Sequence, residues 1–146
     1  MKRIENSRIL FLDEMPIRRL LEFRSDYYPI MLQILDVVYE RKIQMVASPV
    51  TLVDLAGRAY EKNLAVLARE LKEFFTNSAQ FRLRELDAEI AILAAEYRVK
   101  YKFTLEESVQ FATAYVAGAD LVLSENEKAK EVDGLNVLLL SEIQND

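Results

Sequence analysis

Four oxygen-bearing side chains stand where this sequence could do chemistry. They lie directly after apolar runs or near the start of helical segments, and they are Asp13, Asp54, Glu107 and Asn126. Carboxylate and amide oxygens without His or Cys select hard cations such as Mg²⁺ or Mn²⁺. Such an ion can activate water and bridge a phosphodiester. The residue types therefore indicate a metal site for phosphodiester hydrolysis, with Asp13, Asp54 and Glu107 as candidate catalytic carboxylates and metal ligands and Asn126 as a fourth ligand.

The missing residue types narrow the chemistry further. The chain of 146 residues has no Cys, His or Trp. Thiolate nucleophiles, disulfides, Ser-His-Asp triads and zinc sites built on Cys or His are therefore excluded. Catalysis at neutral pH has to rely on carboxylates, Lys, Tyr, Ser or Thr, and on any hard metal that the carboxylates hold.

The charge balance is acidic. Lys and Arg number 19 against 24 Asp and Glu, which gives a formal net charge of -5. A global positive field that would steer the chain toward nucleic acid is missing, so any such contact rests on local groups. Arg18, Arg19 and Ser124, beside the expected strand ends, are the candidates for nucleic-acid binding. Arg residues at such positions also commonly solvate helix faces, and that interpretation stays open.

Short apolar runs predict strands, and apolar residues repeated at helical spacing predict helices. These elements position the candidate side chains. Buried strands are expected at 8–12, 44–47, 119–123 and 135–140. Helices are expected at 16–23, 29–41, 51–60, 64–75, 87–101 and 105–117. Only 3 Gly and 3 Pro interrupt the chain, so no linker divides it. The order predicts one domain, 1–146, with an α/β fold: a three-layer α/β/α sandwich around a short, mostly parallel sheet, whose ligands bind beyond the carboxyl ends of the strands.

Each candidate residue also has an ordinary structural interpretation. Asp13 can cap the helix that follows it. The segment Thr104-Leu105-Glu106-Glu107 matches a capping box, in which the fourth residue bonds back to the first. Asp54 can be a surface acid and Asn126 a turn former. The spacing by itself does not decide between caps and a metal site.

Around these residues the sequence resembles the PIN domain, a family of metal-dependent nucleases that includes the toxin ribonucleases of toxin-antitoxin pairs. The resemblance extends over nearly the whole chain and is carried by the segments 9–13, 47–55, 87–98, 107–114 and 118–126. It implies that Asp13, Asp54, Glu107 and Asn126 hold Mg²⁺ or Mn²⁺. Four positions depart from the family pattern. Glu14 replaces a small hydroxyl residue, Asp54 replaces an expected Glu, and Glu107 replaces an expected Asp. Asn126, in the final acidic motif, is neutral.

Two functions follow. The first is a metal-dependent endoribonuclease acting on single-stranded or structured RNA through metal-activated water, with the toxin of a toxin-antitoxin pair as one form. The second is a PIN-like module with weakened catalysis that binds RNA or a protein partner, and departures at three of the four expected acidic positions motivate it. An α/β protein whose acids are all caps is a third reading. An antitoxin-like partner and a homodimer are further expectations of the resemblance.

The chain is also expected to be cytoplasmic. No apolar run approaches the ~20 residues that a bilayer span requires. The first residues lack the apolar region of a signal peptide. No membrane contact is therefore expected.

Overall fold

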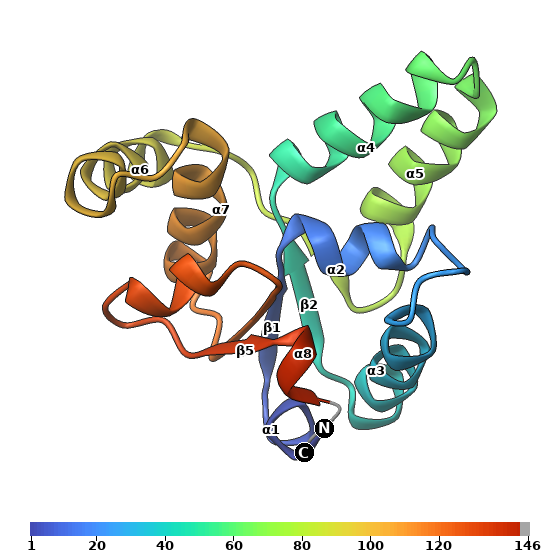
Figure 1. The fold of residues 1–146 in the computed structure, drawn as a ribbon, viewed down its shortest axis with the longest axis horizontal. Coiled ribbons are helices and arrows are strands. Elements are labelled where there is room, and N and C mark those ends of the chain that lie inside the picture. The colour runs from blue at the N-terminus through green and yellow to red at the C-terminus, as the bar shows by residue number, and fades with distance from the viewer. Residues whose placement is uncertain (144–146) are drawn as a thin grey trace.

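The computed structural model describes residues 1–143, which form a parallel sheet with helices on both faces (Figure 1). The strands are β1 (Ile9–Leu12), β2 (Gln44–Ala47), β3 (Phe81–Leu83), β4 (Leu121–Ser124) and β5 (Val137–Leu139). The helices are α1 (Lys2–Glu5), α2 (Glu14–Arg19), α3 (Tyr28–Arg41), α4 (Pro49–Glu61), α5 (Ala65–Asn77), α6 (Ala88–Tyr101), α7 (Leu105–Val116), the 3₁₀ helix η1 (Glu127–Glu131) and α8 (Leu140–Ile143).

The five strands have the order β3-β2-β1-β4-β5, and every neighbouring pair is parallel. The four strands expected from apolar runs are confirmed within a few residues. The expected set was incomplete, because β3 adds a fifth strand at the edge beside β2. This strand is only three residues long and its middle residue, Arg82, is exposed, so it lacks the continuous apolar run of the inner strands.

The sheet is the middle of three layers, which confirms the expected sandwich. Successive residues of β1 point to opposite faces, so Leu10 and Leu12 pack in one core and Phe11 packs in the other. The first core lies under α1 to α5 and α8, and the second under α6, α7 and η1. Figure 1 shows α6 and α7 on one side of the sheet and α2, α3 and α5 on the other.

Side-chain caps fix where the long helices begin. The Ser48 hydroxyl accepts from the Val50 backbone N–H at 3.2 Å, and Pro49 suits the first turn of α4. The Asp87 carboxylate accepts from the Ile90 N–H at 3.0 Å and starts α6. After α7, Gly118 has a φ of +71°, a left-handed conformation that lets the chain turn back toward β4.

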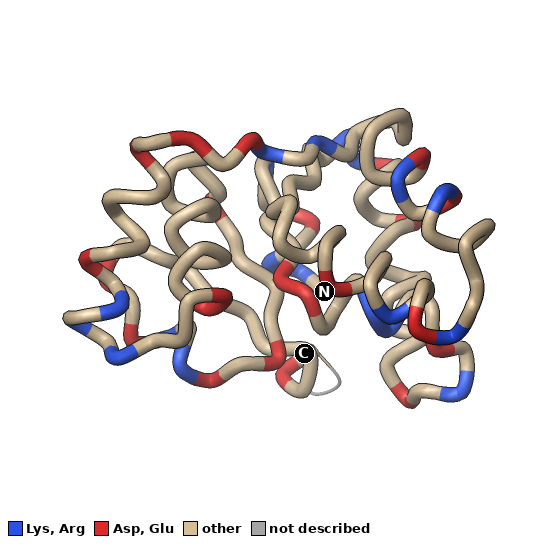
Figure 2. The backbone as a smooth tube through the Cα atoms, turned by 90° about the horizontal axis from the view of Figure 1, so that it is seen from above, with Lys and Arg blue, Asp and Glu red and all other residues tan. Residues whose placement is uncertain are grey.

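The carboxyl ends of β1, β2 and β4 lie along one edge of the sheet, and α2, α4 and η1 begin there. Figure 2 looks down on the molecule from above the view of Figure 1, and shows acidic and basic residues interspersed rather than gathered by sign. Across residues 1–143 no helix has the length and apolarity that crossing a membrane would take.

Candidate metal site at the strand ends

Asp13 and Ser124 meet because β1 and β4 are neighbours in register. Leu12 pairs with Leu123, and the Asp13 N–H donates to the Leu123 carbonyl at 3.0 Å. The next residue on each strand then faces the other: the Ser124 hydroxyl donates to Asp13 Oδ2 at 2.6 Å. Both side chains are buried. The pairing holds the Asp13 carboxyl in one orientation at the centre of the sheet edge.

Asp13 also caps α2, as the ordinary interpretation predicted. Its Oδ1 accepts from the Glu14 N–H at 2.8 Å. Burial raises the pKa of Asp13, and the hydrogen bonds from Ser124 and from the Glu14 backbone only partly oppose this rise. A carboxylate oxygen can accept more than one hydrogen bond, so the cap does not use up the acceptor capacity of this group.

Glu107 forms the predicted capping box at the start of α7. Its Oε1 accepts from the Thr104 N–H at 2.9 Å, and the Thr104 hydroxyl accepts from the Glu107 N–H at 3.1 Å. Burial would raise the pKa of Glu107, but the hydrogen bonds from Thr104 and Asn126 and the charge of Lys128, 3.6 Å away, lower it overall. This carboxylate is therefore held ionised.

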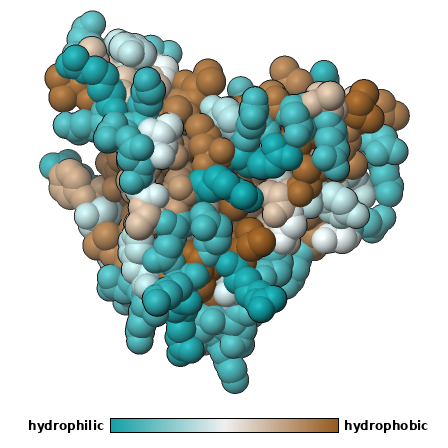
Figure 3. All heavy atoms as spheres, turned by 180° about the vertical axis from the view of Figure 1, so that it is seen from behind, coloured by the Kyte–Doolittle hydropathy of each residue, from teal (hydrophilic) through white to brown (hydrophobic). Residues whose placement is uncertain are grey.

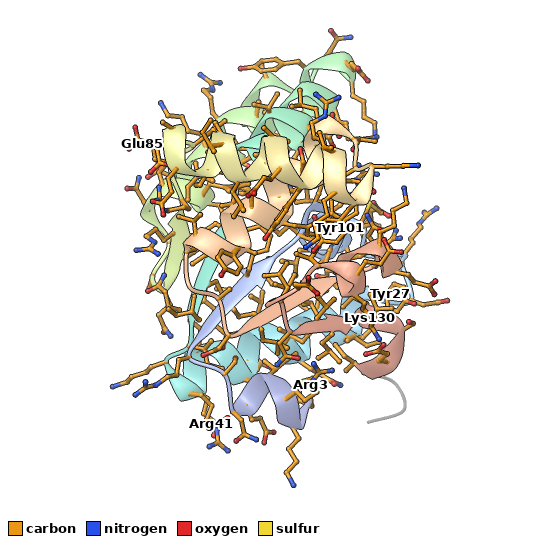
Figure 4. The ribbon with its side chains drawn as sticks, turned by 90° about the vertical axis from the view of Figure 1, so that its left-hand side faces the viewer. Arg3, Tyr27, Arg41, Glu85, Tyr101 and Lys130 are labelled. Carbon is orange, nitrogen blue, oxygen red and sulfur yellow. The ribbon has the colours of Figure 1, made fainter. Side chains whose placement is uncertain are left out.

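Both ends of the Asn126 side-chain amide make hydrogen bonds. Its Nδ2 donates to Glu107 Oε2 at 2.8 Å, and its Oδ1 accepts from the Lys128 N–H at 3.0 Å, which caps η1. Its backbone N–H donates to the Ser124 hydroxyl at 2.9 Å. The segment after η1 also contacts α6. The Asp133 N–H donates to the Tyr101 hydroxyl at 3.1 Å, and Tyr101 is labelled in Figure 4.

One small pocket, of about 130 Å³, brings three of the four candidate ligands together. It is lined by Asp13, Glu14, Met15, Val50, Thr104, Glu106, Glu107, Gln110, Phe111 and Asn126. Asp54 is not among these residues and instead borders a neighbouring hollow with Gly57, Arg58 and Glu61. The structure thus gathers Asp13, Glu107 and Asn126, and leaves Asp54 outside.

Asp54 is held by two guanidinium groups. Its Oδ2 accepts from Arg58 Nε at 2.9 Å and from Arg18 Nη2 at 3.1 Å. Its pKa is lowered to about 2, first by a hydrogen bond from the Glu14 carboxyl and then by Arg58 and Arg18, against the opposing effect of burial. Asp54 is an ion-pair partner in this structure, and its role as a metal ligand stays a prediction.

The two arginines proposed for nucleic-acid binding are both engaged within the chain. Arg18 contacts Asp54 and also lies 3.4 Å from Glu14 Oε2. Arg19 makes a two-bond pair with Glu125, at 2.9 and 3.0 Å, and a further contact with Glu22. Ser124 is buried under Asp13. A role for these three residues in nucleic-acid binding stays a prediction, and it would require the arginine pairs to open.

Sequence reasoning missed Glu14 as a site residue. It lines the pocket beside Asp13, and its Oε1 is buried without a hydrogen-bond partner among the described residues. Burial, the hydrogen bond to Asp54 and the Asp54 charge raise its pKa to about 7, while Arg18 acts in the opposite direction. Its position next to the first acid was a visible signal, read only as a departure from the family pattern.

Gln110 is a second residue that the sequence did not reveal. Its side chain is 4% exposed, and its Nε2 donates to the Thr51 hydroxyl at 2.7 Å, which joins α7 to α4. Its Oε1 is buried with no hydrogen-bond partner among the described residues. Gln110 and Glu14 line the same pocket. Two unpartnered oxygen atoms therefore belong to the wall around Asp13.

The pocket fits a hard cation by its donor set, though not by a triad of acids. Within residues 1–143, no three acidic side chains lie close enough together to hold a metal ion as they stand. Mg²⁺ is commonly held by only one or two carboxylates and keeps several waters. Buried oxygens that lack hydrogen bonds are costly, and a bound cation or water would relieve that cost.

The shifted pKa of Glu14 predicts a pH dependence of stability. Its folded-state pKa of about 7 exceeds the ordinary Glu value of 4.5, so the folded chain keeps a proton that the unfolded chain releases between these values. Stability should therefore fall as pH rises through this window, by about 1–2 kcal/mol after allowance for solvent screening. We expect Glu14→Gln to remove most of this loss, as measured by urea unfolding at pH 5 and pH 7.5. Equal losses in the two proteins would contradict the assignment.

Solved structures with a similar fold exist, whereas comparisons at the level of sequence find nothing. No protein-family model matches this sequence, and no curated protein matches it either. Among solved structures, DNA-bound VapBC from Salmonella typhimurium aligns with a TM-score of 0.70 and 14% identity, covering 90% of this chain and 97% of that chain. VapBC2 from Rickettsia felis, bound to a promoter DNA fragment, aligns with a TM-score of 0.69 and 14% identity, covering 90% and 98%.

A third similar structure is Mycobacterium tuberculosis VapC20, described as a toxin that cleaves the sarcin-ricin loop. It aligns with a TM-score of 0.62 and 13% identity, covering 77% of this chain and 86% of that chain. At such identities the likeness concerns the fold. The chain therefore has a PIN-like fold, the fold of these VapC structures.

Proposed function

We propose that residues 1–146 form a single PIN-like domain that acts as a metal-dependent endoribonuclease, in the manner of the toxin of a toxin-antitoxin pair. One observation carries the proposal: the buried Asp13 carboxyl lies at the carboxyl end of the central strand, in a pocket that also contains Glu107. The similarity to VapBC and to a toxin that cleaves the sarcin-ricin loop supports this choice of chemistry.

The sequence suggests Asp13, Asp54, Glu107 and Asn126 as ligands of Mg²⁺ or Mn²⁺, and three of them, Asp13, Glu107 and Asn126, line one pocket. When bound, the ion would supply an activated water and charge stabilisation for phosphodiester hydrolysis. The chain's own residues orient the carboxylates. Ser124 fixes Asp13 by one hydrogen bond, and Thr104 and Asn126 fix Glu107 by two.

The proposal includes RNA as the substrate, work in the cytoplasm, and association with an antitoxin-like protein or a second copy of the chain. Exposed apolar side chains support a protein partner. They lie on α4 and α6 and in the segments next to them, and include Val53, Tyr60, Val66, Ile92 and Val99. Figure 3 shows hydrophobic atoms on the two lobes that rise at the top of the molecule. Exposed apolar side chains commonly mark protein contacts where they form a contiguous patch.

A second candidate function is the module with weakened catalysis. Asp54 is neutralised by Arg18 and Arg58, and Glu107 and Asn126 are hydrogen-bonded to each other. A ligand set that is committed to internal partners would bind a metal ion weakly. In that case the chain would act by contact with RNA or protein.

Cleavage of a mixed panel of labelled RNAs tests the proposed function. We expect the purified chain to cut at least one RNA with Mn²⁺ and to cut none with excess EDTA. Glu85→Gln is a suitable control, because Glu85, labelled in Figure 4, is exposed on the segment between β3 and α6 and does not line the pocket. A folded chain that cuts no RNA at any Mn²⁺ concentration would favour the module over the nuclease.

A further inference from the structure

Glu14 and Asp54 lie at two different hollows beside the end of β1. Glu14 lines the pocket with Asp13, whereas Asp54 borders the hollow next to it. We propose that Glu14, and not Asp54, is the second carboxylate of the cation site, and that the side-chain oxygen of Gln110 completes the site with Asp13. This inference rests on the proposed function, because it assigns the ligands of the same metal centre.

The free oxygen of Glu14 is the first support. Its side chain is 21% exposed, yet Oε1 is buried and has no hydrogen-bond partner among the described residues. Oε2 takes the contact with Arg18, at 3.4 Å. Glu14 is therefore held by Arg18 and by its hydrogen bond with Asp54, while Oε1 lacks a hydrogen-bond partner among the described residues. A buried carboxylate oxygen in this condition is a strong acceptor for a cation.

Gln110 supplies independent support from a different element. It lies on α7, whereas Asp13 and Glu14 lie at the start of α2. The donor end of its amide is committed to Thr51, so the acceptor end, Oε1, is the part left over. This side chain is more than nine-tenths buried and lines the pocket. An acceptor without a donor, on a residue that lines the same pocket as two carboxyl groups, would be satisfied by a shared positive ion.

Asp54 lacks these properties. Arg58 and Arg18 both donate to its Oδ2, at 2.9 and 3.1 Å, and both bring a full positive charge. A metal ion would have to displace two guanidinium groups or approach them closely, and like charges repel at such distances. Asp54 is therefore committed to Arg18 and Arg58 as their counter-ion.

The resulting ligand set is chemically ordinary. It contains two carboxylates, Asp13 and Glu14, and one neutral amide oxygen, from Gln110. Mg²⁺ and Mn²⁺ accept such a mixture of oxygens and fill their remaining positions with water. The set also agrees with the finding that no three acids converge in the described part of the chain. Glu107 lines the same pocket, and its two carboxylate oxygens accept hydrogen bonds from Thr104 and Asn126.

Mn²⁺ binding to the full chain, measured by titration calorimetry and by the loss of the free-ion signal in electron paramagnetic resonance, tests this assignment. We expect Glu14→Gln to raise the Kd for Mn²⁺ at least tenfold, and Asp54→Asn to change it by less than about threefold. Glu106→Gln is the matched control, because it removes an exposed carboxylate from the rim of the same pocket. Its Kd should also stay within about threefold. Thermal melting without metal establishes that each variant is folded.

Three results would overturn the assignment. They are a Kd that rises tenfold in Asp54→Asn, a Kd unchanged in Glu14→Gln, and the absence of Mn²⁺ binding by the wild-type chain. RNA cleavage is measured separately on the same samples. Glu14-dependent Mn²⁺ binding without cleavage of any RNA would support the ligand assignment while contradicting the proposed nuclease, so the two failures can be told apart.

Discussion

Replacing Asp13 with Asn should reduce metal-dependent RNA cleavage by at least about a hundredfold while the chain stays folded. Loss of a group that only supports a metal ligand commonly costs ~10–100-fold, so loss of the central carboxylate should cost no less. Asn keeps an oxygen that can cap α2 and is among the favoured capping residues. The variant therefore separates the charge of Asp13 from its structural role at the start of the helix.

Initial cleavage rates with Mn²⁺ measure this effect, and circular dichroism melting checks the fold. The Glu85→Gln control removes one negative charge from an exposed position and should keep the wild-type rate. A rate for Asp13→Asn within about threefold of wild type would show that the cut is made elsewhere or by a contaminant. If Asp13→Asn lowers the melting temperature so far that the chain unfolds, Asp13→Glu, which keeps the charge, is measured as the second variant.

Phe75→Ala should lower the free energy of unfolding by about 3–5 kcal/mol, the range for a fully buried aromatic residue truncated to Ala. The Phe75 side chain is 0% exposed. Its ring centroid lies 5.1 Å from that of Phe81 and 5.8 Å from that of Phe74, both in edge-to-face geometry. These contacts attach α5 to β3, the short strand at the edge of the sheet, so truncation should loosen that edge first.

Urea unfolding monitored by circular dichroism measures the change, with Phe23→Ala as the control. The Phe23 side chain is 71% exposed, so its removal should alter stability by no more than about 0.5 kcal/mol. A loss below about 1 kcal/mol for Phe75→Ala would mean that the neighbouring rings refill the space. Hydrogen exchange at β3 would locate the loosened region.

The inner part of the fold could be predicted because a strand buried on both faces is a run of apolar residues in the sequence. β1, β2 and β4 are continuous apolar runs, and the helices between them have regular apolar spacing. The edge strand β3 leaves a weaker trace. Only one neighbour pairs with it, and the exposed Arg82 interrupts its three residues. Pairing with β2 and packing against α5, rather than local preference, make this segment a strand.

The site could be predicted only as far as single elements allow. Asp13 follows its strand directly, and the capping box of Glu107 is contained in four consecutive residues. Asp54 is held as an ion-pair partner by two residues. Arg58 lies four residues along the same helix, and Arg18 lies 36 residues earlier in the sequence. Contacts of the second kind arise from tertiary packing and cannot be read from spacing.

Glu14 and Gln110 were missed by sequence reasoning for a related reason. A Glu in the first turn of a helix is an ordinary favourable residue, since it complements the helix dipole. A Gln among apolar neighbours on α7 gives no sign of which end of its amide is satisfied. What distinguishes both residues is an oxygen without a partner, and that property exists only once α2, α4 and α7 are packed together.

The bond between Asp13 and Ser124 spans 111 positions of the sequence, which has a consequence for synthesis on the ribosome. At about 5–20 residues per second, β1 emerges roughly 5 to 20 s before β4. During this interval β2 can pair with one side of β1, while the other side is an open edge. A nascent chain therefore has no fixed Asp13 carboxyl, and the proposed metal site stays incomplete until residue 124 has left the exit tunnel.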